Sequence, residues 1–139
     1  MTYPFIYLLT KNKKVAVAVA QDEPVLEAIK VAKEKGIVDA TLVGDRTEIK
    51  KVAKKIGMNL DDYEIVNEVN PIKASLEAVR LVSSGKADML MKGLVDTATF
   101  LRSVLNKEVG LRTGKLMSHV SVFEVKGIDR LIILNTILR

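Results

Sequence analysis

The sequence contains no cysteine and only one histidine among its 139 residues. Disulfide bonds, zinc sites built on thiolates and a cysteine nucleophile are therefore excluded, as are metal sites that need several histidine ligands. Adjacent carboxylates at Asp61 and Asp62 have no partner in the sequence and fit a cap or loop better than a metal site. We predict no metal, and the lack of cysteine fits the cytoplasmic location that we expect.

Long apolar runs are missing as well. No stretch approaches the roughly 18 apolar residues that indicate a membrane-spanning helix, so we expect no membrane partner. The chain opens on a short apolar run followed by lysines, whereas a signal peptide carries its positive charge before the apolar run. We interpret residues 1–12 as an N-terminal tail and residues 13–139 as a single α/β domain.

Several motifs of nucleotide-binding proteins and hydrolases are absent. The sequence has no P-loop, no Gly-x-Gly-x-x-Gly after a strand and no Gly-x-Ser-x-Gly. Aromatic residues make up only 4% and the lysines are dispersed along predicted helices, which argues against nucleic-acid binding. The net charge of +5 suits a smaller anionic partner such as a phosphate compound, although solvated lysines on helix faces explain most of it.

The sequence does contain a repeated alternation of apolar strands and amphipathic helices. We expect strands at 15–20, 40–44, 64–69 and 89–91, each followed by a helical pattern. Short uncharged runs such as VAVAVA (15–20) are typical of strands buried on both faces. The alternation predicts right-handed βαβ units, and hence a three-layer αβα fold around a mostly parallel sheet.

Residues with known preferences mark the predicted helix ends. Asp22, Asp45 and Asn70 stand at N-cap positions, and Glu48 completes the spacing of a capping box with Asp45. Prolines in the first turns of two helices fit this assignment. The glycines that follow the first three helices suit left-handed caps; they are Gly36, Gly57 and Gly85.

The pattern changes after the helix expected at about 96–106. Residues 106–117 form a loop with two glycines and three cations, and a loop of this length in a compact domain is often functional. Two further strands, 118–125 and 130–134, are joined by a link too short for a crossover and must be antiparallel. We therefore expect these strands to make the sheet a mixed one.

Lys92 and Gly93 lie where the fourth strand meets its helix, at the strand end where ligands of parallel sheets usually bind. Glycine lets a ligand approach the backbone closely, and lysine supplies a charge suited to phosphate. A simple turn with an exposed lysine is the alternative. Arg112, in the glycine-flanked loop, is a second candidate anion ligand, whereas Arg102 alone indicates a solvated arginine and His119 equally fits a packed strand residue.

Three strings carry a resemblance to a known family: KKVAVAVAQDEPVLEAI (13–29), ADMLMKGLVDTATFLRSVL (87–105) and GLRTGKLMSHVSVFEV (110–125). They resemble the phosphate acetyl/butyryltransferase family, and more closely its phosphate butyryltransferases. The resemblance implies the reaction of acyl-CoA and phosphate to acyl phosphate and free coenzyme A, with coenzyme A as a substrate and no bound cofactor. It also implies the fold of the isocitrate and isopropylmalate dehydrogenases, in which two α/β parts enclose the active site.

Family members are about twice as long as this chain and form dimers or larger assemblies. The resemblance therefore implies a homo-oligomer, and a chain that is the N-terminal half only and truncated relative to the family. A second hypothesis follows from this: a non-catalytic α/β module that binds an anionic phosphometabolite, or a remnant that still folds. The end of the sequence at Arg139, before the second half that the family pattern leads us to expect, motivates that alternative.

Transferred residue by residue, the resemblance implies binding of substrate or phosphate by Lys92, Gly93, Thr97, Arg102, Arg112, Ser118, His119 and Ser121. In the reaction a coenzyme A thiolate attacks the carbonyl of the acyl phosphate, and phosphate leaves. Because both groups are anionic, cations and backbone N–H groups would relieve their repulsion and stabilise the departing charge. No protein nucleophile is required, and we assign no catalytic acid or base.

Overall fold

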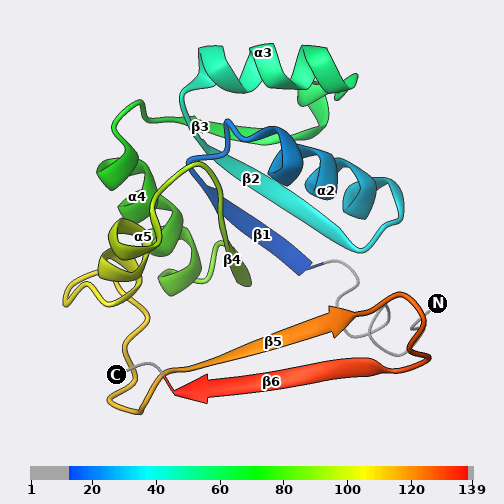
Figure 1. Cartoon of the computed structure of the whole chain (residues 1–139). Helices are drawn as coiled ribbons and strands as arrows, with labels where there is room; N and C mark the ends of the chain where they lie inside the picture. The colour runs from blue at the N-terminus through cyan, green and yellow to red at the C-terminus, as the bar shows by residue number, and fades with distance from the viewer. Residues whose placement is uncertain (1–12, 138–139) are drawn as a thin grey trace.

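The computed structural model describes residues 13–137, with side chains as far as Asn135; the tail predicted at 1–12 lies outside the described residues. Figure 1 shows a parallel sheet with helices on both faces and a separate pair of long strands. No helix in the described range is long and apolar enough to cross a membrane. The elements are β1 (Lys13–Ala18), α2 (Glu23–Glu34), β2 (Val38–Gly44), α3 (Arg46–Ile56), the 3₁₀ turn η1 (Leu60–Asp62), β3 (Glu64–Asn67), α4 (Pro71–Ser83), β4 (Met89–Lys92), α5 (Thr97–Val104), β5 (Ser118–Glu124) and β6 (Leu131–Ile137).

The first four strands form one parallel sheet in the order β3-β2-β1-β4. From β1 the chain moves through α2 and α3 to β2 and β3 on one side, whereas β4 lies on the other side of β1. The order therefore reverses between β1 and β4. In open parallel sheets, ligands bind outside the carboxyl ends of the strands at such a reversal.

Alternating side chains of β1 enter two separate cores, which explains its uninterrupted apolar sequence. Val15 and Val17 pack with residues of α2 and α3, whereas Ala16 and Ala18 pack with residues of α4. The helix α5 lies against α4, on the same side of the sheet (Figure 1). The three-layer αβα arrangement predicted from the sequence is therefore present.

The predicted helix caps are mostly formed. The Asp45 carboxylate accepts hydrogen bonds from the backbone N–H groups of Thr47 and Glu48, at 2.9 and 3.3 Å. The Asn70 side chain accepts equivalent bonds at the start of α4. Asp22 occupies the N-cap position of α2 but its side chain makes no capping hydrogen bond. That part of the prediction is wrong, whereas the proline expected in the first turn of α2 is present.

The strands β5 and β6 form an antiparallel pair, as predicted, but they do not extend the parallel sheet. They pair with one another from Ser118–Ile137 to Glu124–Leu131 and constitute a second, two-stranded sheet. The expected mixed sheet is therefore wrong for the described strands. The physical reason is that β5 has no single apolar face, since Val122 and Phe123 lie on opposite faces, so its sequence does not specify which surface it covers.

The hairpin of β5 and β6 exposes most of its apolar side chains. Every residue of β5 except Ser121 is exposed, and in β6 the Ile133 side chain is 64% exposed. A two-stranded hairpin without further packing is at best marginally stable in water. The hairpin is thus an apolar surface that the described residues leave largely uncovered.

Candidate functional site

The carboxyl ends of β1 and β4 are joined by unusually close packing at Gly93. Its N–H donates to the Ala18 carbonyl at 2.8 Å, and the N–H of Leu94 donates to the Val19 carbonyl at 2.8 Å. A Cβ atom on Gly93 would lie 2.2 Å from the Val19 oxygen and 2.7 Å from the Ala18 oxygen. Glycine is required here because the backbones at the ends of two strands meet. The sequence predicted that a ligand approaches the Gly93 backbone closely. In the structure, the group that approaches it is the backbone of Ala18 and Val19.

Lys92 ends β4 at this same point, and its ammonium group turns back onto its own loop. Nζ donates to the Val95 carbonyl at 2.7 Å and lies 3.5 Å from the Gly93 carbonyl. The Lys92 ammonium therefore lies against residues 93–96, which we call the β4–α5 loop, at the carboxyl edge of the sheet. The side chain stays exposed at this edge.

The helix α5 starts directly after the β4–α5 loop. The Asp96 carboxylate accepts a hydrogen bond from the Thr99 N–H at 2.8 Å. Hydrogen bonds from Thr99 hold the pKa of the Asp96 carboxyl below its usual value, and the charge of Arg102 adds to this effect. Thr97, predicted as a binding residue, is the first residue of α5 and is exposed.

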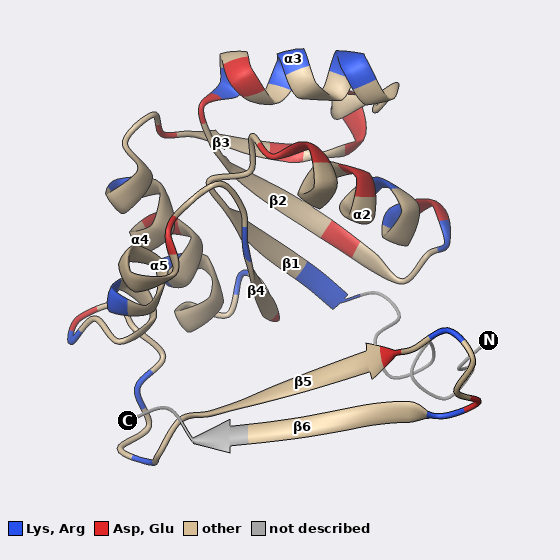
Figure 2. Ribbon diagram, in the orientation of Figure 1, with Lys and Arg blue, Asp and Glu red and all other residues tan. Residues whose placement is uncertain are grey.

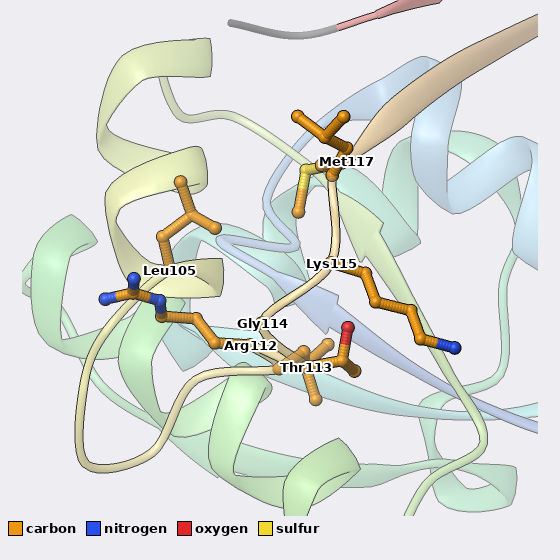
Figure 3. A pocket seen from close by; sticks show the side chains of 8 residues that line it. Leu105, Arg112, Thr113, Gly114, Lys115 and Met117 are labelled. Carbon is orange, nitrogen blue, oxygen red and sulfur yellow. The ribbon is translucent and has the colours of Figure 1, made fainter.

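The loop after α5 encloses a hollow of about 420 Å³. Arg112 and Lys115 supply its cations, and Leu105 and Met117 belong to its apolar wall (Figure 3). The two cationic side chains extend to opposite sides of the hollow in this view. The lining residues are Leu105, Leu111, Arg112, Thr113, Gly114, Lys115, Leu116 and Met117, and we call this space the loop hollow.

Arg102 lines a different and smaller hollow of about 140 Å³ between α4 and α5, together with residues that include Thr99 and Asn106. Ser118, His119 and Ser121 lie on β5, where the Ser121 hydroxyl and His119 Nδ1 are 3.3 Å apart. The predicted site residues therefore fall into separate groups: the β4–α5 loop, the loop hollow, the α4–α5 hollow and the hairpin. The structure does not bring Lys92 and Arg112 to one hollow among those described.

Sequence reasoning did not single out Lys115, which shares the loop hollow with Arg112. The available signal was the cluster of cations in residues 106–117, without any means to decide which of them line a hollow. Elsewhere, Figure 2 shows basic residues in blue along the ribbon of α3, and Lys50, Lys51 and Lys54 of this helix are exposed. These lysines are solvated, as the simpler interpretation of the net charge requires.

Comparison with known proteins decides the family. A family model described as "Phosphate acetyl/butaryl transferase" matches residues 7–73 and 62–136 of the chain. The chain belongs to this phosphate acyltransferase family. Its sequence is 74% identical over 123 residues to the phosphate butyryltransferase of Clostridium beijerinckii, and 70% identical over 125 residues to that of Clostridium acetobutylicum.

The chain spans about two fifths of the length of these phosphate acyltransferases. The aligned regions cover 88% and 90% of this chain but 41% and 42% of the two relatives, and they correspond to the N-terminal half only. A phosphotransacetylase from Streptococcus pyogenes superposes with a TM-score of 0.69, over 96% of this chain and 51% of its own, at 18% identity. A branched-chain phosphotransacylase from Enterococcus faecalis superposes with a TM-score of 0.63 over 88% and 41%, at 22% identity, so the α/β fold is shared as well.

Proposed function

We propose that the chain is part of a phosphate acyltransferase that converts acyl-CoA and phosphate into acyl phosphate and coenzyme A. The observation that carries this proposal is the 74% identity, over 88% of the chain, to a protein named phosphate butyryltransferase. Acyl-CoA, phosphate and acyl phosphate are then the small-molecule partners, and coenzyme A is a substrate. Because these are small soluble anions, we also propose a cytoplasmic location.

The loop hollow has the chemistry that this reaction needs. Arg112 and Lys115 provide positive charge for a phosphoryl group or for the phosphates of coenzyme A. Leu105, Leu111 and Met117 provide an apolar wall that suits an acyl chain. Cations next to the reacting anions would stabilise charge that moves from the thiolate to the departing phosphate.

For the other predicted site residues we propose substrate or phosphate binding, and we propose a larger fold of two α/β parts around them. Thr97, Arg102, Ser118, His119 and Ser121 lie near the loop hollow in the sequence but in other parts of the described fold. We propose that a second α/β part completes the site and brings these groups to one cleft, as in the isocitrate and isopropylmalate dehydrogenases. The order β3-β2-β1-β4, with its reversal beside Lys92 and Gly93, supports a cleft at that edge.

The direct test is a chimeric enzyme, which we call the joined protein. The first part of the Clostridium beijerinckii phosphate butyryltransferase, aligned over 123 residues, is replaced by this chain while the relative's remaining part is kept. We expect phosphate-dependent release of coenzyme A from butyryl-CoA, measured with a thiol reagent, at a rate within about tenfold of the relative's, since transition-state contacts would be retained. A joined protein that folds and binds phosphate without turnover would favour the non-catalytic module instead.

We also propose that the chain forms homo-oligomers through the hairpin. Val122 is 57% exposed and Phe123 47% exposed, and contact between copies would remove these side chains from water. Size-exclusion chromatography is expected to show a larger apparent size as the concentration rises, and Val122→Lys should shift the equilibrium toward monomer. The matched control is Val31→Lys on α2, where the valine is 47% exposed and should have no effect. A monomer at every concentration would contradict the proposal.

A further inference from the structure

The β4–α5 loop is fixed at both of its ends by backbone and side-chain hydrogen bonds. At its start, Gly93 and Leu94 donate to carbonyls of β1 and its following residue, and the Val95 N–H donates to the Gly93 carbonyl at 2.9 Å. At its end, Asp96 caps α5. Between these anchors the Val95 carbonyl points to the side chain of Lys92, which donates to it at 2.7 Å.

The Lys92 contact is a hydrogen bond from a charged donor, and such bonds stabilise more than neutral ones. In the described part of the chain, the Val95 carbonyl takes its hydrogen bond from Lys92. The two carbonyl contacts therefore tie the ammonium to residues 93 and 95 of its own loop.

We propose that Lys92 is a positioning residue: its ammonium holds the carbonyls of the β4–α5 loop and so fixes the carboxyl edge of β4, without contacting the phosphate itself. The identity of the anion rests on the proposed function, but the role of Lys92 in ordering the loop does not. This replaces the direct phosphate contact that the resemblance implies for Lys92. The edge concerned is the one beside the reversal of strand order between β1 and β4.

The test compares three variants of the full 139-residue chain. Lys92→Met keeps the length of the side chain but removes its charge and donors, whereas Lys92→Arg keeps both. Lys50→Met, at an exposed lysine on α3, is the matched control. The first measurement is amide hydrogen exchange of Leu94, Val95 and Thr99 without ligand, because each of these N–H groups has a hydrogen bond within or beside the loop.

We expect Lys92→Met to accelerate exchange at Val95 and Thr99 by about tenfold, the effect of losing one hydrogen bond to a charged group. Lys92→Arg should restore protection, and Lys50→Met should leave it unchanged. The second measurement is titration with inorganic phosphate, followed by the chemical shifts of the same amides. If Lys92 acts through the loop, the apparent affinity for phosphate falls with the loss of protection in Lys92→Met, and both recover together in Lys92→Arg.

Two results would overturn the proposal. Unchanged exchange in Lys92→Met with weakened phosphate binding would make Lys92 a direct ligand, and unchanged exchange with unchanged binding would leave it no role at the site. If no variant, including the parent chain, binds phosphate, the isolated chain lacks a complete phosphate site and turnover of the joined protein decides the proposed function, whereas the exchange rates still decide whether Lys92 orders the loop. Should Lys92→Met fail to fold, Lys92→Gln replaces it. The amide exchange rates and the phosphate affinity of Lys92→Gln are then compared with those of Lys92→Arg by the same criteria.

Discussion

Replacing Gly93 with alanine is expected to lower the free energy of unfolding by about 3 kcal/mol, at the upper end of what overpacking usually costs. The added Cβ would lie 2.2 Å from the Val19 oxygen and 2.9 Å from the Val19 carbonyl carbon, and both are backbone atoms. Relief requires β1 and β4 to separate, which strains the hydrogen bonds from Gly93 to Ala18 and from Leu94 to Val19. Urea denaturation followed by circular dichroism measures the change.

Gly57→Ala is the matched control for this prediction. Gly57 ends α3 with φ of +69°, and a Cβ added there would have no atom within 4 Å, so its cost is conformational and not steric. A left-handed alanine costs about 1 kcal/mol. If Gly93→Ala were no more destabilising than Gly57→Ala, the close contact between the ends of β1 and β4 would be absent in solution.

The elements that the sequence predicted are those whose signals are local. VAVAVA indicates a strand buried on both faces, and its alternate residues do enter two cores. Asp45 and Asn70 cap helices because the acceptor and its donors are two or three residues apart. The same reasoning failed at Asp22, where residue type and position are right but the side-chain hydrogen bond is not made.

The features that the sequence did not predict depend on contacts between distant residues. Nothing in the alternation of β5 specifies the surface that it covers, so its separation from the parallel sheet required the three-dimensional structure. The direction of the Lys92 side chain is a similar case. A lysine after a strand is compatible with a ligand contact or with a contact to its own loop, and only the three-dimensional structure shows the hydrogen bond that Lys92 donates to the Val95 carbonyl.

In the candidate site, too, the sequence predicted local features but not the contacts between distant residues. The cations of residues 106–117 indicated an anion-binding loop, and two of them, Arg112 and Lys115, do line its hollow. The sequence-based hypothesis that Lys92 and Arg112 share one hollow receives no support from the described residues, since Lys92 is bonded within its own loop. The strongest remaining case for an anion contact is therefore Arg112.

In the joined protein, Arg112→Ala is expected to reduce kcat/KM for phosphate by about 100-fold, the usual effect of removing one group that stabilises transition-state charge. Arg112 is exposed, so the denaturation midpoint should barely change and a loss of rate cannot be attributed to unfolding. Arg112→Lys should recover part of the rate, because lysine keeps the charge but not the bidentate geometry of the guanidinium. Release of coenzyme A from butyryl-CoA over a range of phosphate concentrations measures all three proteins.

The matched control is Arg130→Ala. Arg130 is an exposed arginine in the turn between β5 and β6, at the end of the hairpin remote from the loop hollow. Because β5 begins at Ser118 beside the loop and extends for seven residues, about 20 Å of strand separates this turn from the hollow. Loss of one general surface charge would affect both arginine variants alike, whereas an anion contact in the loop hollow affects Arg112→Ala alone. Equal kcat/KM values for the two alanine variants would remove Arg112 from the site and leave Lys115 as the remaining candidate cation of the loop hollow.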